Sequence, residues 1–186
     1  MGDVWGMKQE KRVEQTKQAL QDSLLRLMEK KSLEKITVKE ICDGADVNRS
    51  TFYVYYGSPR EVLEGAKAAL CERVRQMPRD YENIQGLVDK IVSAFYGQRE
   101  MILLLLRDGE VGWMMDVFDV FRDDLVMTLQ RQGISAERAQ RTWLYNAAGM
   151  CAVLARWIVE HPEGMGPEIM EELYGLTMQG LGVYLH

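Results

Sequence analysis

Four consecutive polar residues, 48–51, open a short helical pattern in the first third of the chain: Asn48, Arg49, Ser50 and Thr51. Their side chains are small or forked hydrogen-bonding groups of the kind that reach base edges and phosphate oxygens in nucleic-acid complexes. An asparagine at the first position can also cap the helix that follows it. This segment therefore predicts hydrogen-bonding recognition of a polyanion.

Three tyrosines follow the polar residues: Tyr53, Tyr55 and Tyr56. Phenol hydroxyls at a helix end can donate hydrogen bonds to phosphates while their rings pack on the protein. The segment Ser58–Glu61 then has the spacing of a capping box, with Pro59 at the first helical position, where proline is favoured. Arg60 adds a positive charge at this predicted helix start.

A second short helix is predicted directly before the polar residues. Thr37 and Glu40 have the spacing of a capping box, and apolar residues follow on one face. Two short helices joined by a tight turn are the elements of a helix-turn-helix, here at about residues 37–56. On pattern alone two interpretations stay open, because a helix pair with a polar first turn is also a common purely structural feature.

The rest of the chain has the apolar period of helices and no long alternating segment, which predicts an all-α protein of about nine helices. The longer expected helices are 8–30, one marked by Met114 to Leu129, 135–161 and 167–184. We expect residues 1–57 to form the helix-turn-helix domain, with 1–7 a disordered lead-in. Residues 58–186 are expected to form a helical effector-binding and dimerisation domain.

Charge is divided unevenly between the two ends of the chain. Residues 1–63 contain 11 Lys/Arg and 10 Asp/Glu, a net of +1, whereas residues 64–186 contain 12 and 18, a net of −6; together they give the total of −5. A near-neutral head on an acidic body is consistent with a protein that presents one end to a polyanion.

Several other classes of protein are disfavoured. No apolar run reaches the length of a membrane span, and the N-terminus lacks the apolar core of a signal peptide, so a cytoplasmic protein without membrane contact is expected. The three cysteines are isolated and are interpreted as buried thiols. The two histidines, His161 and His186, lie at helix or chain ends, and no catalytic set appears. We therefore expect no enzyme activity, no metal and no cofactor.

The N-terminal segment resembles the DNA-binding domain of the TetR family of bacterial regulators over about residues 12–65. The matching positions are Ala19-Leu20, Leu24, Ile36-Thr37-Val38, Ile41, Ala45, Val47 to Tyr53, Tyr56 and Val62-Leu63. The Asn48–Tyr53 string resembles the branch of regulators linked to dihydroxyacetone kinase operons, and Trp157 with Pro167 to Ile169 supports that branch.

The resemblance implies an all-α homodimer that binds a palindromic operator in double-stranded DNA. It places Thr37 and Thr51 on phosphates, Arg49 and Ser50 near base edges, and Tyr53 and Tyr56 on the DNA backbone. The last two helices would form the dimer interface, and the preceding helices would enclose a ligand. Asn48, Tyr55 and Arg60 complete the expected DNA-contacting set.

This sequence departs from the family pattern at two positions. Pro59 stands where the family has a phosphate-binding lysine, and Tyr55 stands where it often has histidine. The first change removes one charged contact with DNA. Arg60 is the nearest cation that can compensate for it.

Aromatic residues and methionines are dense in the body and can line a cavity for an apolar or aromatic effector. The expected pocket residues are Tyr96, Met101, Trp113, Met114, Phe118, Phe121, Trp143, Asn146 and Met150. Ordinary core and interface packing explains the same residues equally well. The sequence therefore predicts a regulator, most simply a repressor released by an unidentified small molecule. The alternative is a co-regulator whose body binds a partner protein.

Overall fold

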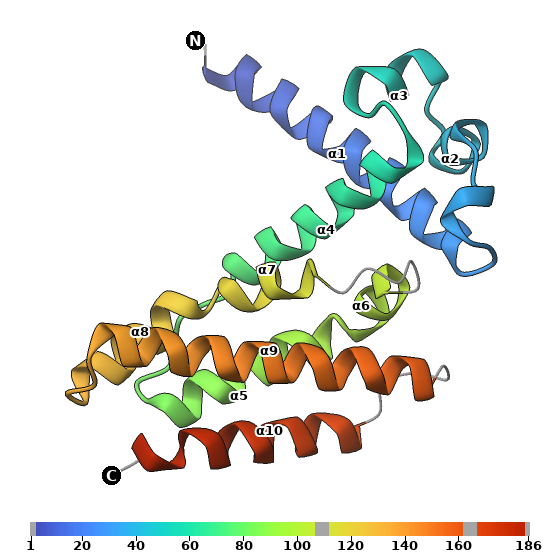
Figure 1. The fold of residues 1–186 in the computed structure, drawn as a ribbon. Helices are drawn as coiled ribbons and strands as arrows, with labels where there is room; N and C mark the ends of the chain where they lie inside the picture. Colours follow the sequence, from blue (N-terminus) through green and yellow to red (C-terminus); the bar gives the residue numbers. More distant parts are fainter. Residues whose placement is uncertain (1–2, 107–111, 162–166, 185–186) are drawn as a thin grey trace. The chain divides into compact units, whose positions relative to one another are not determined.

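The computed structural model describes residues 3–106, 112–161 and 167–184, and every regular element in these ranges is helical (Figure 1). Ten α-helices and two short 3-10 helices are present among the described residues, which confirms the all-α class and a count close to nine. The chain forms two compact units, Met1–Leu70 and Cys71–His186.

The N-terminal unit contains three helices and the beginning of a fourth. They are α1 (Asp3–Met28), the 3-10 helix η1 (Leu33–Lys35), α2 (Val38–Ala45), α3 (Arg49–Tyr55) and α4 (Pro59–Arg75). α1 begins at Asp3, whereas the sequence predicted a disordered lead-in over 1–7. No proline interrupts α1.

The core of this unit joins α1 to α2 and α3. Leu24, Ile41 and Phe52 are completely buried. The Ser23 hydroxyl donates a hydrogen bond of 2.9 Å to the carbonyl of Ile41. A Cβ atom on Gly44 would lie only 2.4 Å from the same hydroxyl, so α2 approaches α1 closely because it has a glycine there.

The turn between α2 and α3 depends on one backbone conformation. Asp46 is the C-cap of α2 and has φ 53° and ψ 43°, the left-handed region. Aspartate is one of the few residues other than glycine that visits this region routinely. The short turn that the sequence predicted thus ends α2 and lets Asn48 start α3.

The C-terminal unit is built from seven further elements. They are α5 (Ile84–Gly97), α6 (Arg99–Leu106), α7 (Met114–Asp119), α8 (Arg122–Arg131), α9 (Ala136–Glu160), α10 (Pro167–Leu181) and the 3-10 helix η2 (Gly182–Tyr184). Contacts of α5 with α8 and α10, and of α9 with α7, α8 and α10, hold the unit together (Figure 1). Ser135 caps α9 by accepting a hydrogen bond from the Arg138 amide, as the sequence predicted.

The single helix expected from Met114 to Leu129 is wrong, because the chain breaks into α7 and α8 at Val120 and Phe121. Arg79 supplies the physical reason. It donates a hydrogen bond of 3.3 Å to the carbonyl of Val120, and its guanidinium lies 4.6 Å from the centre of the Phe121 ring. It also pairs with Asp124 at 3.2 Å. A distant cation therefore satisfies a carbonyl at the helix break.

The boundary between the compact units lies after Leu70, inside α4, whereas the sequence placed the domain boundary at residue 57. The start of α4 packs closely in the N-terminal unit. A Cβ atom on Gly65 would lie 2.7 Å from the Tyr56 hydroxyl and 3.1 Å from the Gln21 side-chain nitrogen. The first turns of α4 are therefore part of the head.

The cysteines are in apolar surroundings to different degrees: Cys42 and Cys151 are buried and Cys71 is partly exposed. Burial raises the pKa of the Cys151 thiol to about 12, with the Asp119 charge adding to the shift. In the part of the chain that the structure describes, no three His, Cys, Asp or Glu side chains are grouped to hold a metal ion. None of the described helices has the length and apolarity needed to cross a membrane.

Candidate nucleic-acid interface and ligand groove

The predicted capping box at the start of α2 is present. The Glu40 amide donates to the Thr37 hydroxyl at 3.3 Å, and the Thr37 amide donates to the Glu40 carboxylate at 3.0 Å. Lys31 also donates to this carboxylate. The Lys31 hydrogen bond, followed by those from Thr37, lowers the pKa of Glu40 to about 2. Thr37 is exposed beside this charged cap, where the sequence predicted a phosphate contact.

The start of α3 is fixed by Asn48, which the structure confirms as its N-cap. The side-chain oxygen of Asn48 accepts three hydrogen bonds: from the Ser50 hydroxyl at 2.6 Å, the Thr51 hydroxyl at 2.9 Å and the Thr51 amide at 3.0 Å. The first turn of α3 is therefore held together by the same side chains that the sequence predicted to contact DNA.

The outer surface of α3 carries accessible polar side chains. Arg49 and Ser50 are exposed, and Tyr53 is 54% exposed with its ring edge-on to the buried Phe52 ring at 5.4 Å. Tyr55 is partly exposed. These positions give a DNA duplex free access to the side chains, and their contacts with DNA stay predictions.

Tyr56 has a different environment from the other predicted contacts. It is 8% exposed, and its hydroxyl accepts a hydrogen bond of 2.8 Å from the side-chain amide of Gln21, which is also buried. The Tyr56 hydroxyl thus has a partner inside the protein that the sequence did not reveal. Its predicted contact with the DNA backbone is untested.

The start of α4 has the predicted cap in a modified form. The Glu61 amide donates to the Ser58 hydroxyl at 3.3 Å, but the Glu61 carboxylate accepts from the Gly57 amide at 2.8 Å. Arg60 is exposed next to this cap. It contributes, after hydrogen bonds from the backbone and Ser32, to the lowered pKa of Glu34.

One exposed residue of α3 was missed by the sequence analysis. Val54 is 72% exposed in the last turn of the helix. Its position two residues after the buried Phe52 was the available signal, because residues two apart on a helix point to different sides.

Most residues of the predicted ligand pocket are packed in the core instead. Met114, Phe118 and Phe121 are completely buried, and the Phe118 ring stacks on Phe95 at 4.2 Å. Trp113, Trp143 and Met150 are also buried, and Met101 is partly buried. The ordinary packing that the sequence left open explains these seven side chains.

Hydrogen bonds within the protein engage Trp143 and Asn146, whereas the buried ring nitrogen of Trp113 has no hydrogen-bond partner among the described residues. The Trp143 ring nitrogen donates to Asp119 at 3.0 Å, and the Asn146 side-chain nitrogen donates to the Thr142 carbonyl at 2.8 Å. The Asn146 oxygen would lie 3.2 Å from a Cβ atom on Gly180, so this asparagine lies where α9 and α10 approach closely.

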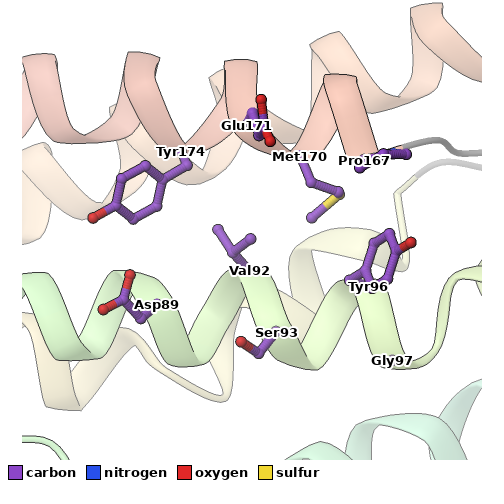
Figure 2. A pocket seen from close by; sticks show the side chains of 9 residues that line it. All are labelled: Asp89, Val92, Ser93, Tyr96, Gly97, Pro167, Met170, Glu171 and Tyr174. Carbon is purple, nitrogen blue, oxygen red and sulfur yellow. The ribbon is translucent and has the colours of Figure 1, made fainter.

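A groove of about 660 Å³ lies between α5 and α10, and Tyr96 is the member of the predicted pocket that lines it (Figure 2). The lining residues are Asp89, Val92, Ser93, Tyr96, Gly97, Pro167, Met170, Glu171 and Tyr174. Figure 2 shows Val92 and Met170 near the middle, with Tyr174 and Asp89 towards one end and Tyr96 and Pro167 towards the other. Burial and the neighbouring Asp89 raise the pKa of Tyr174.

Comparisons with known proteins agree with the helix-turn-helix geometry. Residues 21–66 match the family model described as "Bacterial regulatory proteins, tetR family". No curated protein matches the chain in sequence.

Solved structures with similar folds span nearly the whole chain. The "Dihydroxyacetone kinase operon activator DhaS" has a TM-score of 0.67 and 18% identity, covering 91% of this chain and 94% of its own. A TetR transcriptional regulator from Streptococcus agalactiae has a TM-score of 0.60 and 18% identity, covering 92% and 98%. GusR of Salmonella enterica has a TM-score of 0.57 and 17% identity, covering 90% and 95%. At these identities the likeness shows the fold.

Proposed function

The chain is a transcription regulator of the tetR family, and we propose that it binds a palindromic operator as a homodimer and represses transcription until a small molecule releases it. The observation that carries this proposal is the capped α2–turn–α3 pair, which the family model covers. Arg49, Ser50 and Tyr53 are exposed on α3, where a recognition helix meets the major groove.

Selection of bound DNA from a random pool, at defined salt, tests this function. We expect enrichment of a palindrome with half-sites about one helical turn, roughly 34–36 Å, apart. Arg49→Ala should abolish the enrichment, whereas Arg122→Ala, which removes an exposed arginine on α8, should preserve it. Failure of the wild-type protein to enrich any sequence would contradict the proposal.

The proposal of a homodimer is supported by exposed apolar residues on α9 and α10, here called the apolar stripe. Tyr145 is 79%, Leu144 58% and Leu176 50% exposed, although large apolar side chains are normally withdrawn from water. Small exposed residues of α9 lie beside them: Ala148, Gly149 and Ala152. Small residues let helices of two subunits approach closely. A second copy of the chain is therefore the partner proposed for this stripe, because a two-fold dimer matches a two-fold operator.

The groove between α5 and α10 is the proposed effector site. Its volume lies in the range of small-molecule sites. Asp89 and Glu171 are charged, and none of the nine lining residues is Lys, Arg or His. The Arg99 guanidinium covers one face of the Tyr96 ring, 4.6 Å from its centre, so Tyr174 is the main aromatic side chain proposed for the ligand. Charge and aromatic faces together favour an organic cation with an apolar body.

Such a ligand would act by joining α5 to α10. Since α10 carries part of the proposed dimer stripe, a ligand that favours one α5–α10 arrangement also favours one dimer geometry. The release of DNA would follow from a change in the spacing of the two heads. The effector would therefore change DNA binding through the dimer geometry, without contacting DNA itself.

Thermal unfolding with matched probes tests the groove. We expect 4-phenylbutylammonium to raise the unfolding temperature and 4-phenylbutanoate to leave it unchanged. Glu171→Gln should weaken binding of the ammonium probe about fivefold, the size of one partly exposed charge contact. Glu172→Gln is the matched control, because Glu172 is exposed on α10 and does not line the groove. Equal responses to both probes would contradict a cation site.

A co-regulator that binds a partner protein is the second candidate. The fold similarity to a protein described as an operon activator supports activation as the alternative direction of control. A reporter gene behind the selected operator distinguishes the two directions of control. A stable complex with a neighbouring gene product in gel filtration, together with no response to small cations, would favour the co-regulator.

A further inference from the structure

Val54 is an apolar residue without an apolar environment. It is 72% exposed in α3, while Phe52 two residues earlier is completely buried. A β-branched residue at an exposed helical position gains little from burial and has a modest helix propensity. Neither packing nor helix formation therefore explains why valine stands there.

The position of Val54 on α3 places it on the helix surface that faces away from the protein core. Residues advance by about 100° along a helix, so Val54 lies about 200° round from Phe52. Ser50, one turn earlier, is on the same side and is also exposed. The outward surface of α3 thus presents a hydroxyl and, one turn later, two methyl groups.

The major groove of DNA displays a single kind of methyl group, the C5-methyl of thymine. The other groups at the base edges are mainly hydrogen-bond donors and acceptors, which lose free energy when an apolar side chain covers them without replacing their water. We propose that Val54 is a specificity-determining residue that contacts the C5-methyl group of one thymine in each operator half-site. This proposal rests on the DNA-binding function proposed above.

Deoxyuridine provides the test, because it differs from thymidine only in lacking the C5-methyl group. Each thymine of the selected half-site is replaced in turn by deoxyuridine, symmetrically in both half-sites, and Kd is measured by fluorescence anisotropy at fixed salt. We expect one replacement to weaken wild-type binding about tenfold, as two lost methyl contacts would. Val54→Ala should bind the thymine operator more weakly and should discriminate less than twofold at that position.

Two controls test whether a loss of affinity in Val54→Ala is specific to that side chain. Val126→Ala changes a partly exposed valine on α8, in the other compact unit, and should keep the full tenfold response to deoxyuridine. Val54→Ala lies on the surface and should retain the wild-type unfolding midpoint in urea, so a loss of affinity will not reflect misfolding.

The possible failures of the two proposals are distinguishable. If the wild-type protein selects no operator, the proposed DNA-binding function is wrong. If it selects an operator but no deoxyuridine replacement weakens binding, Val54 does not read a methyl group. If a replacement weakens wild type and Val54→Ala equally, another residue reads that methyl group and the inference about Val54 is overturned.

Discussion

The side-chain amide of Gln21 donates a hydrogen bond of 2.8 Å to the hydroxyl of Tyr56, and both residues are buried. Gln21 lies in α1 and Tyr56 is the C-cap of α3. The hydrogen bond therefore ties the helix that supports the head to the end of the helix that is proposed to read DNA. Gly65 of α4 leaves room for this pair.

Tyr56→Phe should destabilise the head. The substitution removes the acceptor and leaves the buried Gln21 amide without its partner, a loss of about 1–3 kcal/mol. Urea unfolding of the full chain measures it, and Tyr55→Phe is the control because Tyr55 is partly exposed. Unchanged stability with weaker DNA binding would mean that the Tyr56 hydroxyl acts on DNA instead.

Gly65→Ala should also destabilise the protein, by roughly 1–3 kcal/mol. The new Cβ atom would lie 2.7 Å from the Tyr56 hydroxyl and 2.9 Å from its ring, and the buried ring has little space to move. Gly97→Ala is the matched control. Nothing lies within 4 Å of a Cβ atom there, so that helical glycine should accept alanine at no cost. Equal unfolding midpoints for the two variants would refute the close packing.

Glu40 should make the stability of the head depend on acid pH. Because hydrogen bonds lower its pKa from 4.5 unfolded to about 2 folded, its contribution is complete above pH 4.5. That contribution is lost as the pH falls from about 4.5 towards 2. Glu40→Gln keeps a hydrogen-bonding side chain in the cap but cannot titrate. The gap between the urea midpoints of wild type and variant should therefore shrink across this interval; a constant gap would contradict the assignment.

Arg79→Ala should destabilise the C-terminal unit by about 1–3 kcal/mol. It removes a hydrogen bond to the Val120 carbonyl, an ion pair with Asp124 and a cation over the Phe121 ring at once. Arg79→Lys retains the charge but not the planar fork and should recover part of the loss. Thermal unfolding measures the stability of both variants. An alanine variant as stable as wild type would contradict the role of Arg79 at the α7–α8 break.

Tyr145→Asp should convert the proposed dimer to monomers in sedimentation experiments. A charge in the centre of an apolar interface must lose its water without gaining a partner. Met127→Asp changes another exposed apolar residue, on α8 and away from the α9–α10 stripe, and should leave the molecular mass unchanged. A Tyr145→Asp variant that remains dimeric would place the interface elsewhere.

Local chemistry made the helix starts predictable. Thr37, Asn48 and Ser135 cap the helices that their spacing indicated, because an N-cap needs only residues within one turn. The family resemblance added the order of the helices. Several features that escaped prediction depend on residues distant in the sequence.

The helix break at Val120 could not be predicted locally, because Arg79, which donates a hydrogen bond to the Val120 carbonyl, lies on a different segment. The same is true of Tyr56, whose partner is 35 residues away. Aromatic density likewise could not separate core from pocket, because the fold buries Phe118 completely and leaves Tyr96 37% exposed beside the groove. The groove between α5 and α10 exists through tertiary packing alone.

The crowded oxygen of Asn48 has a consequence for recognition. This oxygen already accepts three hydrogen bonds from Ser50 and Thr51, and these bonds fix the orientation of the side-chain amide. The part of the side chain left to meet DNA is its NH2 group, which only donates. An aspartate would cap α3 equally well but would confront the phosphates with a negative charge. The choice of asparagine thus lets one residue start a helix and remain compatible with a polyanion.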